Sequence, residues 1–203
     1  MNFEKKSYGG GRPVFVNPPT LVGGGFELDT SAQSFAIGTV IPAGTLAIVN
    51  ESTRKVKVLK SARVTAISTE DTKIVTLEHD EYLSNLFAVG DLVHIIPADD
   101  PDPLVEVTVT AVNEGVVTLS AAIPSLEVGD IITQIKKVND EAAFIDTFNA
   151  ATIAPIKVVN GINGIDVTKD ALMFARRVLP VPASLKTNDM LTANPHVRYS
   201  NSL

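Results

Sequence analysis

The sequence predicts a mainly β fold: a compact β body that carries an inserted small β-barrel-like domain and an extended N-terminal arm. Three observations lead to this prediction. Polar and apolar residues alternate over 55–60, as they do in a strand with one face in water. Turn residues such as Pro42 and Gly44 separate short apolar runs. An internal repeat fills the middle of the chain, which with 203 residues is long enough to bury a core.

The repeat consists of three pairs of segments in the same order, and each pair supplies a strand or a turn that leads into a strand. Their offset falls from 45 to 42 to 39 residues, so two loops are each three residues shorter in the second copy. Two such copies pair into a small closed barrel or a sandwich, which removes exposed sheet edges. The pairs are 64–67 with 109–112, 75–77 with 117–119, and 89–93 with 128–132.

Residues 1–30 are predicted to form an extended arm, because glycine and proline are concentrated there. Glycine triplets at 9–11 and 23–25 are costly to order, and Pro18 and Pro19 donate no backbone hydrogen bond. A disordered leader is the alternative for this composition.

The remaining segments are assigned from their patterns. Residues 166–178 are predicted as a helix or a final strand, and 140–149 as a short helix or a turn. An acidic, proline-rich link separates the two copies of the repeat. The predicted parts are the arm 1–30, the body 31–60 with 136–183, the insert 61–135, the link 98–103 inside the insert, and a polar C-terminal tail 184–203.

Composition and charge argue against several classes of function. The chain has 17 basic and 23 acidic residues and a net charge of −6, which does not suit nucleic-acid binding. It has no cysteine, which excludes disulfides, a thiol nucleophile and thiolate metal sites. No apolar run reaches the length of a membrane span, and the first residues do not read as a signal peptide. We therefore expect a protein made in the cytosol, without a membrane partner.

The sequence offers few candidates for chemistry. His79, His94 and His196 are far apart in the sequence and predict no metal site. Asp91 and Asp130 occupy equivalent turns of the repeat, where an aspartate typically accepts a nearby backbone N–H. We therefore expect no enzyme, no metal and no cofactor. The pair Arg176 and Arg177 is interpreted either as an anchor for a carboxylate or a partner subunit, or as a surface pair beside a buried face.

Three stretches of the chain resemble head fiber proteins of tailed bacteriophages, as found in phages and prophages of Bacteroides-like gut bacteria. The turn that leads into a charged strand also resembles lambda-type head decoration proteins. A sustained heptad pattern is missing, so a compact knob is expected rather than a long shaft. The stretches are 17–30, 39–45 followed by 53–58, and 175–178 with 180–183.

The resemblance implies a structural virion protein on the outer capsid surface, made in the cytoplasm of the bacterial host. It implies a homotrimer that contacts the major capsid protein and stabilises the head or mediates adhesion. On this basis Phe15, Phe26 and Leu28 are expected as capsid-binding anchors of the arm, and Arg176 and Arg177 at a subunit interface. The alternative is a carbohydrate- or surface-binding β module that recognises a host-surface glycan.

Overall fold

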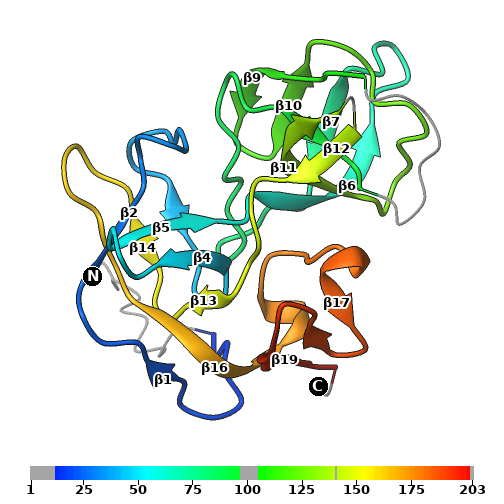
Figure 1. Cartoon of the computed structure of the whole chain (residues 1–203). Helices are drawn as coiled ribbons and strands as arrows, with labels where there is room; N and C mark the ends of the chain where they lie inside the picture. Colours follow the sequence, from blue (N-terminus) through cyan, green and yellow to red (C-terminus); the bar gives the residue numbers. More distant parts are fainter. Residues whose placement is uncertain (1–11, 97–104, 140, 202–203) are drawn as a thin grey trace, which may run out of the picture.

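The structure is a computed structural model that describes residues 12–96, 105–139 and 141–201 (Figure 1). Strands dominate the described residues, and the helical elements there are the single 3-10 turns η1 (Ala175–Arg177) and η2 (Ala183–Leu185). The predicted mainly β fold is confirmed. The predicted link at 98–103 lies outside the described residues.

The larger sheet of the described residues belongs to the body and runs in the order β15-β2-β5-β4-β13-β16-β19-β18-β17, with β1 beside β16. Most neighbours are antiparallel, but β2 with β5 and β16 with β19 are parallel pairs. Its strands are β1 (Thr20–Leu21), β2 (Phe26–Leu28), β4 (Leu46–Asn50), β5 (Lys55–Val58), β13 (Ala150–Thr152), β15 (Gly164–Ile165), β16 (Val167–Phe174), β17 (Lys186–Thr187), β18 (Met190–Leu191) and β19 (Asn194–Ser200).

A second sheet runs in the order β12-β11-β6-β7-β10-β9, with β8 beside β11, and lies at the upper right of Figure 1. A separate ribbon pairs β3 with β14. These strands are β3 (Val40–Ile41), β6 (Ser61–Ile67), β7 (Ile74–Leu77), β8 (Val93–His94), β9 (Val109–Asn113), β10 (Val116–Leu119), β11 (Ile131–Val138), β12 (Glu141–Phe144) and β14 (Ile156–Lys157).

The two copies of the sequence repeat form matching structures that cross over one another. The N–H of Gly90 in the first copy donates to the carbonyl of Val109 in the second, and Gly129 donates to Val64 in the same way, both at 2.8 Å. Both glycines have positive φ, at 93° and 105°, which the turn requires and which favours glycine. The turn of each copy is therefore hydrogen-bonded to a strand of the other copy.

A regular closed barrel is not confirmed for this sheet. The segments that would close it meet at an isolated bridge between Leu92 and Thr108, with backbone hydrogen bonds from Val93 to Val107 and from Val109 to Asp91. The order of the sheet otherwise ends at β9 and β12.

Three apolar clusters form the interior. The insert cluster draws its buried members from Ala62 to Ile132, so the predicted insert 61–135 has a core of its own, although its Leu83 and Leu86 pack into the first body cluster. The first body cluster contains Phe26, Leu28 and their neighbours. The second body cluster lies around Met173. Burying apolar surface stabilises by about 25 cal/mol per Å², so each cluster contributes to the fold.

The arm and the tail differ from the prediction. Within 1–30, β1 pairs with β16 and β2 pairs with both β5 and β15, so 20–28 belongs to the sheet. Within 184–203, β19 runs parallel to β16, and Val197 and Tyr199 are buried there. This stretch has a polar composition because only alternate side chains of β19 face the core, while the others face water.

Two further segments are strands where a helix was one of the alternatives. Residues 167–174 form β16, so the strand alternative holds and the helix does not, but the strand is not the final one because three more follow it. Residues 141–144 form β12, which pairs with β11 across the expected boundary at 135/136. The hairpin β11–β12 therefore extends the sheet of the insert.

Candidate interaction site

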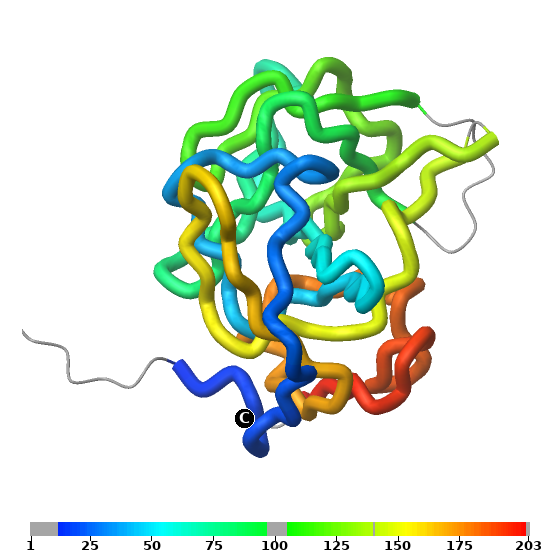
Figure 2. The backbone as a smooth tube through the Cα atoms, turned by 60° about the vertical axis from the view of Figure 1, so that its left-hand side comes forward, coloured from blue at the N-terminus to red at the C-terminus, as the bar shows by residue number. Residues whose placement is uncertain are grey.

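The first described residues, 12–22, lie along the edge of β16, and Figure 2 shows them as the dark blue tube at the bottom of the molecule. The N–H of Val16 donates to the carbonyl of Leu172 at 2.8 Å, and Phe174 donates to Val14 at 2.9 Å. Further along, Val22 donates to Val167 at 2.9 Å. Residues 12–22, which we call the arm strand, thus add an antiparallel strand to the sheet.

Two arginines hold the beginning of the arm strand. The guanidinium of Arg177 donates to the carbonyl of Pro13 at 2.8 Å and lies 4.4 Å from the ring of Phe174. The guanidinium of Arg12 donates to the carbonyl of Arg176. The predicted pair Arg176 and Arg177 therefore contacts the arm strand within this chain, and its place at a subunit interface stays a prediction.

The three predicted capsid anchors have different environments. Phe15 is half-buried, forms an antiparallel bridge with Met173 and packs against the second body cluster. Phe26 and Leu28 are 4% and 0% exposed, because β2 is an inner strand between β5 and β15. The prediction that they bind a partner through the arm is therefore corrected: both belong to the chain's own core. The outward side chains of the arm strand are Val16 and Leu21, which are 40% and 55% exposed.

Two contacts join the three stretches that carry the family resemblance: β2 pairs with β5, and the turn before β4 packs against Val178. Gly44 has φ 78°, and a Cβ built there would lie against a methyl group of Val178 and 2.7 Å from one of Val14. Thr45 and Thr152 fix the same turn through hydrogen bonds from both hydroxyls to the carbonyl of Pro42. The arm strand, the turn and the segment after β16 thus form one packed unit.

A buried ion pair joins the body to the insert. The ammonium of Lys60, which follows β5 in the body, lies 2.7 Å from a carboxylate oxygen of Asp91 in the insert, and the two side chains are 0% and 5% exposed. The ammonium also donates to the carbonyl of Ser34 and lies 4.4 Å from the ring of Phe35. The same carboxylate oxygen accepts the N–H of Ala88 at 2.8 Å.

Two glutamines extend this network across the same boundary. The amide of Gln134 donates to the other oxygen of Asp91 at 3.0 Å, and Gln33 donates to Gln134 at 2.7 Å. Gln33 in turn exchanges two hydrogen bonds of 2.8 Å with the backbone of Val58. We call this set, Lys60 with Asp91, Gln134 and Gln33, the buried joint. It leaves Asp91 without a free oxygen for catalysis.

The charged form of the joint has an energetic cost. Burial lowers the pKa of Lys60 below its usual range, and the Asp91 carboxylate opposes this shift only in part. A lowered lysine pKa means that the charged form is less favourable in the folded chain than in the unfolded chain. The free-energy cost of burying the charged Lys60 is therefore fully present at pH values below the pKa that Lys60 has in the folded chain. It decreases as the pH rises from there toward the pKa of an ordinary lysine.

The pseudo-equivalent Asp130 has a simpler role. Its carboxylate accepts the N–H of Glu127 at 2.8 Å, as Asp91 does with Ala88. This confirms the interpretation of both aspartates as local turn acceptors. Asp91 is buried and also pairs with Lys60, whereas Asp130 is only partly buried. The two equivalent turns therefore differ in what their aspartates contact.

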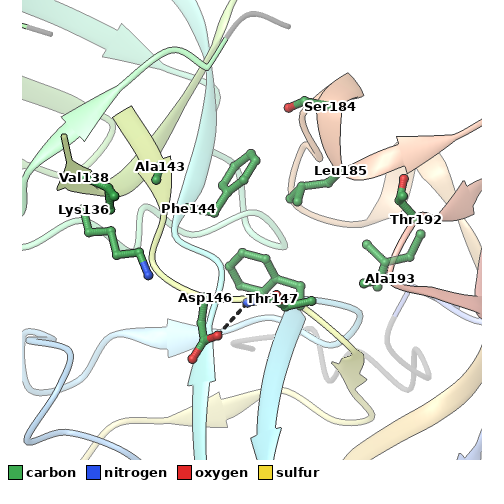
Figure 3. Close-up of a pocket in the computed structure, with 12 residues that line it drawn as sticks. Lys136, Val138, Ala143, Phe144, Asp146, Thr147, Ser184, Leu185, Thr192 and Ala193 are labelled. Atoms are coloured by element: carbon green, nitrogen blue, oxygen red, sulfur yellow. Dashed lines mark hydrogen bonds between the residues drawn. The ribbon is translucent and has the colours of Figure 1, made fainter. Parts of the chain in front are cut away.

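An open groove of about 540 Å³ lies between hairpin β11–β12 and the segment 184–193 (Figure 3). Phe144 and Leu185 lie on opposite sides of it, and Lys136 and Asp146 stand near its rim. Phe148 packs edge-on against Phe144, with ring centroids 6.2 Å apart, and is buried. We call this the C-terminal groove; its lining is apolar, with polar groups at the rim.

The three histidines, for which the sequence predicted no metal site, have different environments in the structure. His79 and His196 are exposed, and the buried His94 places Nδ1 2.6 Å from the carbonyl of Ile95. Over 12–96, 105–139 and 141–201, no group of three or more histidine, aspartate or glutamate residues has the arrangement of a metal site. In the same residues, no helix has the length and apolarity needed to cross a membrane.

Comparison of the chain with protein-family models, with curated proteins and with solved structures found no match.

The buried joint is the part of the site that sequence reasoning missed. The alternation over 55–60 predicted Lys60 on the wet face of a strand, but β5 ends at Val58 and the next two residues are both buried. The break appears in the sequence as Val58 and Leu59, two adjacent apolar residues where an alternating strand would have one. The two adjacent apolar residues show where the alternation ends, but they do not predict that Asp91 pairs with Lys60.

We predict that Gly44→Ala destabilises the chain by about 2–4 kcal/mol, because a strained positive φ adds to overpacking against Val14 and Val178. Gly161→Ala is the matched control, since Gly161 has φ 95° but open space around its Cβ position. Urea unfolding measures both. Equal losses in the two variants would contradict the close packing at Gly44.

We predict that Lys60→Met or Asp91→Asn alone costs about 3–5 kcal/mol, because each leaves a buried charge unpaired. The double variant should lose less stability than the sum of the two single losses. The difference, which is the coupling energy of the pair, should be about 2–3 kcal/mol. The deficit of the double variant relative to the wild type should grow as the pH approaches 10, because only the wild type gains stability as the buried lysine loses its proton.

The exposed pair Lys55 and Glu27, whose charged atoms are 2.8 Å apart, is the control for this cycle. Its coupling should stay below about 1 kcal/mol. Urea titrations at several pH values supply all the free energies. A coupling near zero for Lys60 and Asp91 would show that the pair does not form in solution.

Proposed function

We propose that this chain is a structural protein of a tailed-bacteriophage head, displayed on the outer capsid surface as a head fiber or decoration protein. The supporting observation is that three stretches distant in the sequence, each resembling that family, contact one another through the pairing of β2 with β5 and the packing of Gly44 against Val178. A chance likeness of isolated turns would not require the stretches to converge in space. The protein would be made in the bacterial cytoplasm, from a phage or a prophage.

The arm strand supplies the proposed contact with the major capsid protein. No charged side chain occurs over 13–25, and the outer side of the arm strand carries the exposed Val16 and Leu21. An uncharged apolar edge pairs readily with another chain, which is why sheet edges are usually blunted by charge. This edge therefore suits a protein that adds to a sheet on the capsid surface.

The proposed role is non-catalytic and requires no metal or cofactor. It consists of stabilising the head or mediating adhesion, and the proposed assembly is a homotrimer. The turns of the insert expose Val89 and Val128, each 63% exposed, and they belong to a different sheet from the one that the arm strand joins. Arg12 of the arm strand contacts Asp80 and Tyr82 of the insert, so we propose that these two turns, and not the whole insert, face outward from the particle.

A carbohydrate- or surface-binding module remains the alternative, and the C-terminal groove is the place where it would bind a host-surface glycan. Phe144 offers one half-buried ring there, while Phe148 is buried beneath it. Glycan-array binding that Phe144→Ala removes, without binding to capsids, would favour this alternative.

We predict that Val16→Asp with Leu21→Asp lowers binding to assembled capsids at least tenfold, because two carboxylates would lie on the proposed contact edge. The measurement is co-sedimentation with capsids that lack the protein. Val89→Asp with Val128→Asp, a matched pair of exposed valines in the insert, should bind like the wild type. Undiminished binding by the arm variant would contradict the proposed contact. A deletion of 1–30 is unsuitable, because it removes the core strand β2.

A further inference from the structure

We propose that the arm strand is exchangeable, and that in the assembled oligomer residues 12–22 of one protomer occupy the β16 edge of a second copy. The inference takes the oligomeric state from the proposed function, but it concerns how the protomers are joined and not what they bind. It rests on three features of the arm strand: the kind of contacts it makes, its tether, and its reach.

The contacts of the arm strand are of a kind that any copy of the chain can supply. They are backbone hydrogen bonds to Leu172, Phe174 and Val167, the capping contacts of Arg177 and Arg176, and the contacts of Arg12 with Asp80 and Tyr82. Its inward side chains, Val14 and Phe15, pack on the cluster around Met173. A second copy presents the same edge, so exchange conserves every one of these contacts.

The tether between the arm strand and the core consists of three glycines. Gly23 and Gly25 have no neighbouring atoms within 4 Å of a Cβ position, and Gly24 and Gly25 have positive φ. Pro18 and Pro19, by contrast, restrict the arm strand itself to an extended form. The backbone at Gly24 lies against the guanidinium of Arg54, so this contact must open before the tether can carry the arm strand to another copy.

The arm strand is long enough to reach a neighbour. Residues 12–22 bend at Val16 and Asn17 where they lie on β16, and fully extended they would span about 36 Å, whereas a folded chain of this length has a radius of gyration of about 17 Å. Docking within one chain is favoured in dilute monomers, because the tether gives a high local concentration. Once protomers are held together, the β16 edge of a neighbouring protomer competes on equal terms with the chain's own β16 edge for the arm strand. Exchange would also place Arg176 and Arg177 at a subunit interface, as the family resemblance implies.

The absence of cysteine permits a direct test by disulfide trapping. Thr20 and Asp170 are exposed Cα partners across the arm strand and β16, and antiparallel partners lie within the range that a disulfide spans. Thr20→Cys and Asp170→Cys are made as separate single variants, refolded together in equal amounts and oxidised. Exchange predicts a covalent dimer that joins one chain of each kind, identified by mass spectrometry of the linked peptide.

The double variant Thr20→Cys with Asp170→Cys gives the second readout. Exchange around a closed ring predicts covalent oligomers on non-reducing gels, whereas docking within the chain gives a monomer with one internal disulfide. The control is Ala111→Cys with Thr118→Cys, Cα partners in the β9–β10 hairpin, which should give a monomer in either case. Circular dichroism verifies that each variant folds.

A monomer from the double variant, together with no mixed dimer from the single variants, would overturn the exchange. If the same protein still sedimented with capsids, the proposed function would stand and only the exchange would be lost. Cross-linked oligomers that fail to bind capsids would give the opposite result, since they would support the exchange and contradict the capsid role.

Discussion

The buried pair of Lys60 and Asp91 is the interaction on which the arrangement of this molecule depends. It lies where the chain leaves the body sheet and enters the insert, and the glutamines at 33 and 134 extend it to both sides. A buried pair costs desolvation, so its contribution is orientation more than stability. Removing one partner leaves an uncompensated charge, and this fixes how the insert sits on the body.

The body has a matching constraint at Gly44, where the arm strand, the turn and the segment after β16 are packed without room for a methyl group. Together the two constraints separate the molecule into a rigid base with an exposed strand and an insert with its own core. A base that presents a pairing edge and carries an insert is the architecture on which the proposed decoration role depends.

The fold class and the repeat could be predicted because both depend on local signals, namely alternation, turn residues and the Val-Gly-Asp turns at 89–91 and 128–130. The contacts made between distant segments could not. Phe26 and Leu28 resemble exposed anchors beside glycines until β2 is seen between two other strands. The tail after residue 184 looks polar because only alternate residues of β19 face the core. Lys60 is buried by a partner 31 residues away, which no local pattern specifies.

We expect the buried joint to make the body and the insert one cooperative unit. Differential scanning calorimetry of the whole chain tests this expectation. A single transition is expected, with a calorimetric enthalpy equal to the van't Hoff enthalpy. Two separated transitions, one for the insert and one for the body, would show that each core unfolds alone and that Lys60 and Asp91 do not couple them.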